Sequence, residues 1–345
     1  MPAHRVAVIG DVAGHLDELR VELTRLGADP HTGRLPDDLT VVQVGDLIHR
    51  GPASDAVVAL VDGYLTDQPG QWVQLVGNHE AQYLREPAFD WPDRIGRRAS
   101  DTLRRWWDEG RMQVAAAVLS ETEQYLITHA GVTTDFWRGM LPAPRSAVQA
   151  AALINALKGE DADAIFRAGA MLHGRRLPGG GSRERDTREK GTREKGTTEK
   201  GTRERGTRGN GPRDGATGID APRPVGSREP GSRAVGPVWA ATACELLPGW
   251  LGTTLPFSQI HGHDSIFDWR RRRFRANPDT DVADELAHRT AVDEPAKHEI
   301  TALAGGRIIG VDPGHGAQAH HPWRAWEIRT GQAQAVPGVG ASGIE

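Results

Sequence analysis

Five polar side chains follow short apolar runs along this chain, and all five are of types that bind divalent metals. In chain order they are Asp11, Asp46, Asn78, His129 and His263. Each follows, within a few residues, an apolar run typical of a buried strand, such as residues 41–44 before Asp46. Because open α/β folds bind ligands beyond the carboxyl ends of their strands, we expect the five groups to meet at one sheet edge. Carboxylate, amide and imidazole ligands together suit Mn, Fe, Zn or Mg.

Each of these residues also has an ordinary structural explanation when it is taken alone. An Asp after a Gly is commonly a turn residue or a helix cap, and a single His is commonly a hydrogen-bonded polar residue. Five such residues in the same position relative to successive strands favour a metal site instead. Arg50 lies four residues after Asp46, and His79 is next to Asn78. We therefore predict metal and phosphate chemistry at this edge.

The first third of the chain alternates predicted strands and helices. We predict strands at 5–9, 39–44, 71–76 and 124–128, and helices at about 15–26, 54–65, 93–109 and from about residue 80. Successive polar strand ends lie roughly 30 residues apart, which is typical of βαβ units and predicts a largely parallel sheet. Further on we predict helices at about 145–157, 161–171 and 236–247, a strand at 257–263, a loop at about 276–300, and closing strands at 307–312 and 325–329. Arg270–Arg273 suit either a phosphate clamp or an exposed strand, and the strand is favoured.

A low-complexity segment divides the chain. Residues 1–176 form the first part of one predicted domain, 177–235 an insertion, 236–332 the second part and 333–345 a flexible tail. The insertion repeats a five-residue unit, Thr-Arg-Glu-Lys-Gly with small variations, and contains almost nothing apolar to bury. A period of five matches neither a helical face nor strand alternation, so we predict that the insertion is disordered. Its alternative role as a basic tether for nucleic acid is weak because acidic residues intersperse the basic ones.

Composition excludes several classes of protein. The chain has 345 residues, 38% of them hydrophobic, a net charge of -4 and a single cysteine, Cys244. The charge favours neither nucleic acid nor an anionic membrane as the main partner, and one cysteine excludes a disulfide framework and a thiolate-rich zinc site. The sequence has no apolar run of the roughly 20 residues that a bilayer span requires, and no signal-peptide pattern. We expect a cytoplasmic protein.

Several blocks of this sequence resemble those of one enzyme family. They are residues 10–19 (GDVAGHLDEL), 45–52 (GDLIHRGP), 77–80 (GNHE), 129–131 (HAG) and 262–263 (GH). In this order they resemble the calcineurin-like metallophosphoesterases, in particular the phosphoprotein phosphatase and diadenosine-tetraphosphatase-like branch. The resemblance covers about residues 5–139 and 236–328. It implies an α/β fold, a four-layer α-β-β-α sandwich of two mixed sheets, with two divalent metal ions at their joined edges.

The resemblance also implies a role for each matched residue. Asp46 would bridge the two metals, Asp11 would hold one of them, and the other would be completed by Asn78, His129 and His263. Arg50 and Asn78 would contact the substrate phosphate. His79 would be the general acid, an imidazolium that protonates the leaving oxygen. The implied reaction is hydrolysis of a phosphate monoester, of a phosphoprotein or a small molecule, by a metal-activated water.

Three positions depart from the family pattern. The first block commonly has a histidine ligand where this chain has Ala13, which weakens one metal site unless His15 replaces it. The phosphatases commonly have an aspartate that pairs with the general acid, where this chain has His49. An imidazole cannot raise the pKa of His79 as a carboxylate would. In the tetraphosphatase-like branch, an arginine follows a block similar to residues 236–239. This chain has Ala240 at that position.

These departures leave three functions open. The leading hypothesis is a metal-dependent phosphatase. The second is a hydrolase of dinucleoside polyphosphates or similar anhydrides, which His49 favours. The third is a degenerate relative that binds a phosphorylated ligand without turnover, which Ala13 favours.

Overall fold

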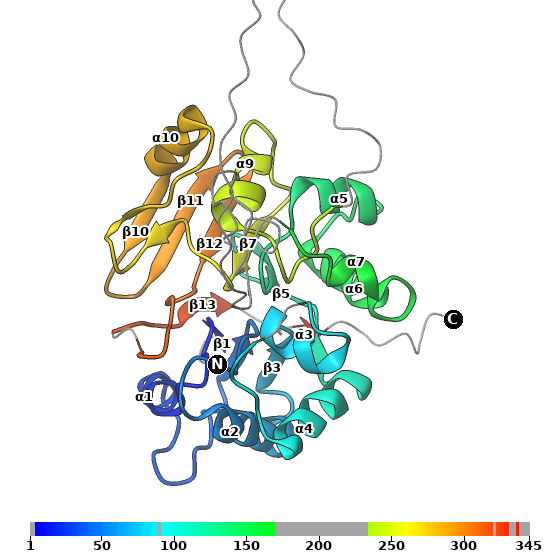
Figure 1. The fold of residues 1–345 in the computed structure, drawn as a ribbon, viewed down its shortest axis with the longest axis vertical. Coiled ribbons are helices and arrows are strands. Elements are labelled where there is room, and N and C mark those ends of the chain that lie inside the picture. Colours follow the sequence, from blue (N-terminus) through cyan, green and yellow to red (C-terminus); the bar gives the residue numbers. More distant parts are fainter. Residues whose placement is uncertain (1–3, 89–90, 170–233, 320–321, 331–335, 338–345) are drawn as a thin grey trace, which may run out of the picture. The chain divides into compact units, whose positions relative to one another are not determined.

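The computed structural model describes residues 4–88, 91–169, 234–319, 322–330 and 336–337. A five-stranded sheet has the order β13-β1-β2-β3-β4. Its strands are β1 (His4–Ile9), β2 (Leu39–Gln43), β3 (Trp72–Leu75), β4 (Met112–Gln113) and β13 (Trp326–Thr330). β1 to β4 are parallel, as the spacing of the strand ends predicts, and β13 pairs antiparallel with β1. Helices α1 (Leu16–Leu26), α2 (Ser54–Asp67) and α4 (Arg97–Asp108) lie on one side of this sheet, and α3 (Asn78–Leu84) follows β3 (Figure 1).

A seven-stranded sheet has the order β10-β11-β12-β7-β6-β5-β14. Its strands are β5 (Ala115–Leu119), β6 (Gln124–Thr128), β7 (Ser258–His261), β10 (Thr290–Asp293), β11 (His298–Leu303), β12 (Gly306–Gly310) and β14 (Val336–Pro337). β7 pairs parallel with β6 and β12, and the other pairs are antiparallel. The associated helices are α5 (Thr134–Met140), α6 (Ala147–Glu160), α7 (Ala162–Ile165), the π-helix η1 (Thr242–Leu246), α9 (Leu247–Trp250) and α10 (Thr280–Arg289). A hairpin of β8 (Phe267–Asp268) and β9 (Arg273–Phe274) stands apart.

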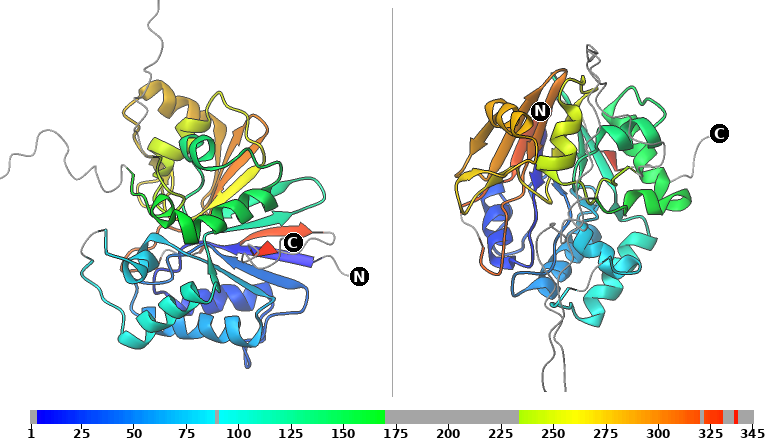
Figure 2. Two further views of the ribbon diagram at one scale, coloured as in Figure 1. Left: turned by 90° about the vertical axis from the view of Figure 1, so that its right-hand side faces the viewer. Right: turned by 45° about the horizontal axis from the view of Figure 1, so that its top comes forward.

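The two sheets pack face to face, and alternation along the strands creates both sides of the sandwich. Val6 and Val8 of β1 lie in the apolar cluster between the sheets, together with Ile127 of β6. Ala7 and Ile9 belong to the cluster on the helical side. Successive side chains of a strand point to opposite faces, so a strand covered on both faces is buried at every position, as Val6–Ile9 are. The fold is therefore the predicted α/β sandwich of two mixed sheets between helices (Figure 2).

The predicted loop at 276–300 is wrong. This segment contains α10, β10 and the start of β11. Asp279 caps α10 by accepting hydrogen bonds from the backbone N–H groups of Asp281 and Val282. Of α10 only Leu286 is fully buried, and β10 is the edge strand of its sheet, so the segment has few apolar residues to reveal it. The exposed strand predicted at 270–273 shrinks to Arg273, because the preceding arginines form the turn between β8 and β9.

Most other predicted boundaries hold within a few residues. The helix predicted at 236–247 is instead a turn followed by η1 at Thr242–Leu246, and the one predicted at 161–171 is the four-residue α7. The elements that the sequence missed include β4, β5, β8 and α5. β5 was missed because three of its five residues are alanine, and α5 because it has only seven residues.

The predicted insertion lies outside the described residues except at its end, where Ala234 and Val235 pack against the core. In the predicted tail, residues 336–337 pair with β5 and the remainder lies outside the described residues. No helix in the described ranges is long and apolar enough to cross a bilayer.

Candidate active site

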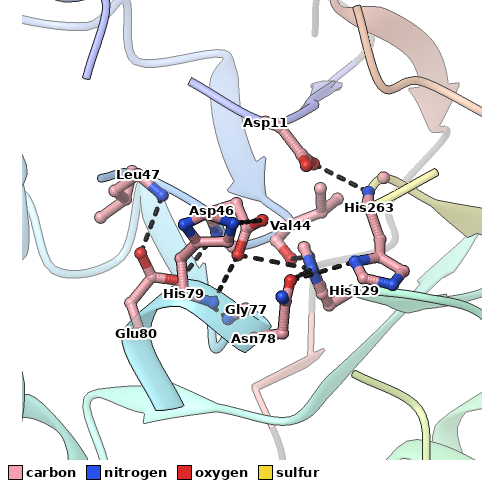
Figure 3. A network of polar contacts seen from close by, with 12 residues as sticks. Asp11, Val44, Asp46, Leu47, Gly77, Asn78, His79, Glu80, His129 and His263 are labelled. Atoms are coloured by element: carbon pink, nitrogen blue, oxygen red, sulfur yellow. Dashed lines mark hydrogen bonds and ion pairs between the residues drawn. The ribbon is translucent and has the colours of Figure 1, made fainter. Parts of the chain in front are cut away.

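The five predicted ligands come from both sheets and lie at their adjoining edges. Asp11 and Asp46 follow β1 and β2, and Asn78 begins α3 after β3. His129 and His263 follow β6 and β7 of the other sheet. Figure 3 shows the five side chains converging from these separate strand ends. The strand pattern predicted a single sheet edge, whereas the five residues meet where the edges of two sheets adjoin, as the resemblance implied.

Four of the five side chains are in direct contact. The side-chain oxygen of Asn78 lies 3.0 Å from Nε2 of His129 and 3.0 Å from Nδ1 of His263. Nε2 of His129 lies 3.4 Å from Oδ1 of Asp46. One ligand atom from each of Asp46, His129 and His263 lies within 4.8 Å of the other two. Asp11 joins the cluster through the backbone, since its Oδ1 accepts a 2.9 Å hydrogen bond from the N–H of His263.

The orientation of these groups suits a cation. Nδ1 of His129 lies 3.0 Å from the carbonyl oxygen of Val44, which requires the proton on Nδ1 and leaves the Nε2 lone pair facing the cluster. Nε2 of His263 is buried and has no hydrogen-bond partner among the described residues. In this orientation the Asn78 oxygen faces imidazole lone pairs. Turning the amide over would let its NH₂ group donate to Asp46 and to both rings. A cation bound between the Asn78 oxygen and the two rings would also offset the repulsion between their lone pairs.

Buried charge at this edge also favours a cation. Burial raises the pKa of Asp11 well above its usual range, and the nearby carboxyls of Asp312 and Asp46 raise it further. Burial likewise raises the pKa of Asp312 to about 6. Burial lowers the pKa of both His129 and His263, which keeps these imidazoles neutral. Crowded carboxyls repel one another, and a divalent cation among them offsets the repulsion. The residues present therefore fit a metal centre.

The predicted general acid and phosphate clamp lie beside the cluster. The N–H of His79 donates a 2.9 Å hydrogen bond to Oδ1 of Asp46, and its Nε2 lies 3.7 Å from Oδ2 of the same carboxylate. The guanidinium of Arg50 lies 5.4 Å from the ring centre of Trp91 and is exposed. The positive charge of Arg50 lowers the pKa of Asp11, in opposition to burial, so Arg50 is within electrostatic range of the cluster.

The backbone around the cluster is held in unusual conformations. Asp46, His49, Arg50, Ala13 and His263 all have positive φ angles, which cost free energy in residues other than glycine. Hydrogen bonds from the N–H of Ala13 to the carbonyl of Asp46 and from the N–H of Gly51 to the carbonyl of Ala13 join the first two loops. Such conformations persist where the surrounding structure fixes them, as at functional sites.

Sequence reasoning did not assign roles to Glu80 and Asp312, which the structure places at the site. The Glu80 carboxylate accepts hydrogen bonds from the N–H groups of Asp46, Leu47 and Gly77, so it fixes the loop that carries Asp46. Asp312 follows β12 as the other carboxylates follow their strands. The same pattern of a strand followed by a carboxylate could have found it.

His15 lies elsewhere. Its Nε2 lies 2.9 Å from the carbonyl oxygen of Gly316, and its ring centre is 4.9 Å from that of His315. Ala13 is buried with φ of 51°. The imidazole that was considered as a substitute ligand therefore contacts the loop after β12 rather than the cluster of Asp46, His129 and His263.

Comparison with known proteins agrees with the motifs. Residues 4–169 match the family described as calcineurin-like phosphoesterase. The match identifies residues 4–169 as a calcineurin-like phosphoesterase domain, a family that binds divalent metals. The zinc-dependent endopolyphosphatase of Saccharomyces cerevisiae is 39% identical over 72 residues, which are 21% of this chain and 19% of that protein. The chain thus spans about a fifth of the length of this curated relative.

Two solved structures show weaker similarity. A yeast protein serine/threonine phosphatase is 21% identical, with 38% of this chain and 39% of that chain covered and a TM-score of 0.29. A cold-active protein-tyrosine phosphatase from a psychrophilic Shewanella is 17% identical, with 50% and 54% covered and a TM-score of 0.34. Similarity at this level does not bear on the substrate of this chain.

Proposed function

We propose that this protein is a metal-dependent phosphatase that hydrolyses phosphate monoesters of a phosphoprotein or a small molecule. The observation that carries the proposal is the cluster of Asp46, His129 and His263, whose ligand atoms lie within 4.8 Å of one another beside the imidazole of His79. Family membership supports the reaction class. The substrate would be phosphorylated, and neither nucleic acid nor a membrane is proposed as a partner.

The proposed metal ligands divide between two ions of Mn, Fe, Zn or Mg. Asp46 would bridge them, Asp11 would hold one, and Asn78, His129 and His263 would complete the other. When bound, two such ions activate water and neutralise the oxygens of an in-line displacement. The protein supports this set by burial and by fixed orientation, since His129 is held by Val44 and Asp46 by Glu80.

The remaining steps use groups of the chain itself. Arg50, exposed next to the cluster, would bind the substrate phosphate, and its fixed positive charge suits a dianion. The amide of Asn78 would contact the same phosphate. His79 would deliver a proton from Nε2 to the leaving oxygen, because that nitrogen faces Asp46 and the cluster.

A second function has a specific observation in its favour. His49 stands where the protein phosphatases resembled here carry an aspartate, and its Nδ1 lies 2.7 Å from Nδ1 of His79. The curated relative is named for a polyphosphatase activity, which cleaves a phosphoanhydride. Because the leaving group of an anhydride needs less protonation, a weaker acid would suffice for that substrate. Hydrolysis of a dinucleoside polyphosphate or a similar anhydride is therefore the alternative.

Metal analysis combined with a substrate panel tests the proposal. We expect the isolated protein to hold about two equivalents of metal, as a two-metal mechanism requires, and to hydrolyse para-nitrophenyl phosphate and a phosphopeptide. Activity confined to diadenosine tetraphosphate or polyphosphate would establish the alternative instead. One metal or none, with no turnover of any substrate, would identify a degenerate relative that only binds.

We expect the substitution Ala13→His to raise metal affinity modestly and to change turnover by less than about tenfold, or about 1.4 kcal/mol of barrier. The new imidazole stands two residues after Asp11, and histidine tolerates the positive φ of 51° at this position better than most residues. We expect turnover to change little because the other two departures from the family pattern, His49 and Ala240, remain. Metal stoichiometry and para-nitrophenyl phosphate turnover measure the effect.

His15→Ala is the control for this substitution, since His15 contacts Gly316 rather than the cluster. We expect it to leave metal content unchanged. A wild-type protein that already binds two metals tightly and gains nothing from Ala13→His would show that the site near Ala13 is not weakened.

A further inference from the structure

Three side chains form a hydrogen-bonded row that leads away from the candidate metal cluster. Nδ1 of His79 lies 2.7 Å from Nδ1 of His49, and Nε2 of His49 lies 2.8 Å from the hydroxyl of Tyr83. The Tyr83 hydroxyl in turn accepts a 3.2 Å hydrogen bond from the N–H of Ile95. All three side chains are buried. His49, in the middle of this row, stands at the position where the phosphatases that this chain resembles commonly carry an aspartate.

The number of protons available fixes which atom donates in each hydrogen bond of the row. A phenol has one proton to donate and two lone pairs, and Ile95 fills one lone pair. Among the described residues, the remaining hydrogen-bond partner of the Tyr83 hydroxyl is Nε2 of His49. If Tyr83 accepted there as well, its own proton would be buried without an acceptor, which is costly. Tyr83 therefore donates to Nε2 of His49.

The same count continues through both imidazoles. A neutral His49 that accepts at Nε2 carries its proton on Nδ1 and donates it to Nδ1 of His79. A neutral His79 that accepts at Nδ1 carries its proton on Nε2. This is the nitrogen that faces Asp46, at 3.7 Å from its Oδ2. Burial lowers the pKa of His49 to about 3, so this residue is neutral at ordinary pH.

The surroundings hold the His49 ring in place. It stacks on Trp91 with the ring centres 5.5 Å apart and the planes 15° from parallel. Its backbone N–H donates to Oγ of Ser54 at 2.9 Å, and its φ of 71° is fixed between neighbouring loops. A side chain constrained at both its backbone and its ring can orient a neighbour precisely enough for proton transfer.

We propose that His49 and Tyr83 are positioning residues that keep the proton of neutral His79 on Nε2, where it meets the leaving oxygen. As Nε2 gives up this proton, Nδ1 of His79 takes the Nδ1 proton of His49, and Nε2 of His49 takes the hydroxyl proton of Tyr83. This inference rests on the proposed phosphatase function. A carboxylate at position 49 would instead bind the Nδ1 proton of His79 and favour its cation. The row of His49 and Tyr83 fixes orientation and tautomer without adding negative charge. It matters most for substrates with poor leaving groups, which are alkyl phosphates.

A comparison of leaving groups tests the proposal by kinetics. For Tyr83→Phe we expect the kcat/KM of an alkyl ester, a phosphoserine peptide, to fall by about tenfold or more, because acid catalysis contributes about 100-fold or more to such reactions. For para-nitrophenyl phosphate, whose leaving group needs no proton, we expect a fall of less than about threefold. Equal losses with the two substrates, or none with either, would overturn the proposal.

Tyr64→Phe is the matched control. Tyr64 is also a buried tyrosine, its hydroxyl donates to the carbonyl of Gly33 at 2.8 Å, and it stacks on Trp72 rather than on the site. We expect it to leave the ratio of alkyl to aryl turnover unchanged. A change in this ratio as large as that of Tyr83→Phe would show that the effect is merely structural and would overturn the proposal.

A second measurement does not depend on activity. Nitrogen-15 NMR of the imidazoles in the full-length protein, with metal removed by chelation, reports which nitrogen of each histidine carries the proton. We expect the proton of His79 on Nε2 in the wild type. In His49→Asp we expect Nδ1 of His79 to carry a proton, because a carboxylate can only accept there and aspartate tolerates positive φ.

The same tautomer in both proteins would overturn the assignment. If the wild type hydrolyses neither ester, the proposed function fails, and this NMR comparison still decides whether His49 and Tyr83 set the tautomer of His79.

Discussion

Asp46→Asn is expected to abolish most of the metal binding and to lower kcat/KM for para-nitrophenyl phosphate by at least about 100-fold, or about 2.7 kcal/mol. Asp46 is at the centre of the cluster, with Nε2 of His129 3.4 Å away and the N–H of His79 donating to it at 2.9 Å. A bridging carboxylate is shared by two cations, and an amide oxygen is a poorer ligand for both. Asparagine tolerates the φ of 54° at this position, so the loss should not come from unfolding.

Asp11→Asn is the comparison that tests the bridging role, and Asp38→Asn is the distant control. Asp11 would hold one metal only, so we expect a smaller loss of bound metal from Asp11→Asn than from Asp46→Asn. Asp38 pairs with Arg5 at 3.0 Å, away from the cluster, and its amide variant should retain metal and activity. Equal losses from the Asp11 and Asp46 variants, or a reversed order, would mean that Asp46 does not bridge.

The sequence predicted the positions of the ligands well because each one follows a strand. A strand signal is local, and parallel neighbours place their carboxyl ends at one edge, so Asp11, Asp46 and Asn78 could be brought together without coordinates. His129 and His263 follow β6 and β7, which pair in parallel in the other sheet. Their convergence with the first three depends on how the two sheets meet. That step came from resemblance rather than from spacing.

Partners that lie beside these ligands were harder to predict. Glu80 was seen only as part of a motif, yet it accepts hydrogen bonds from three backbone N–H groups and fixes the Asp46 loop. Tyr83 reaches His49 only because α3 turns its side chain back toward the loop after β2. Neither contact has a periodic signal, because each joins one helix residue to one loop residue about 30 positions away along the chain.

The error at residues 276–300 has a different origin. β10 is the edge strand of its sheet, and α10 buries only Leu286 completely. An edge strand and a surface helix can be mostly polar, so their composition is that of a loop. The cap at Asp279 was the available signal, since an Asp that precedes a helical segment commonly accepts from its first N–H groups.

Gly77→Ala is the substitution expected to cost the most stability, about 1–3 kcal/mol or more of unfolding free energy. A Cβ on Gly77 would lie 2.2 Å from Oδ1 of Asp46, 2.3 Å from the backbone nitrogen of Asp46 and 2.7 Å from Oε2 of Glu80. Such approaches are far below contact distance, and one of them is to backbone, so rotating a side chain cannot relieve them. The Asp46 loop must therefore move away from α3.

This movement would break the contacts that hold the site together. The N–H groups of Asp46, Leu47 and Gly77 all donate to Glu80, and a displaced loop leaves that buried carboxylate without donors. A buried group that loses its hydrogen bonds costs about 1–3 kcal/mol in addition. Because Asp46 moves as well, bound metal should fall together with stability.

Gly63→Ala is the matched control, and its effect should have the opposite sign. Gly63 lies within α2, and a Cβ there would have no atom within 4 Å. Alanine is favoured over glycine inside a helix by about 0.5–1 kcal/mol, so Gly63→Ala should stabilise the protein slightly. Urea unfolding of both variants, with metal content measured in parallel, provides the comparison. If Gly77→Ala unfolds at the wild-type midpoint and keeps its metal, the close contact between Gly77 and the Asp46 loop does not hold the site together.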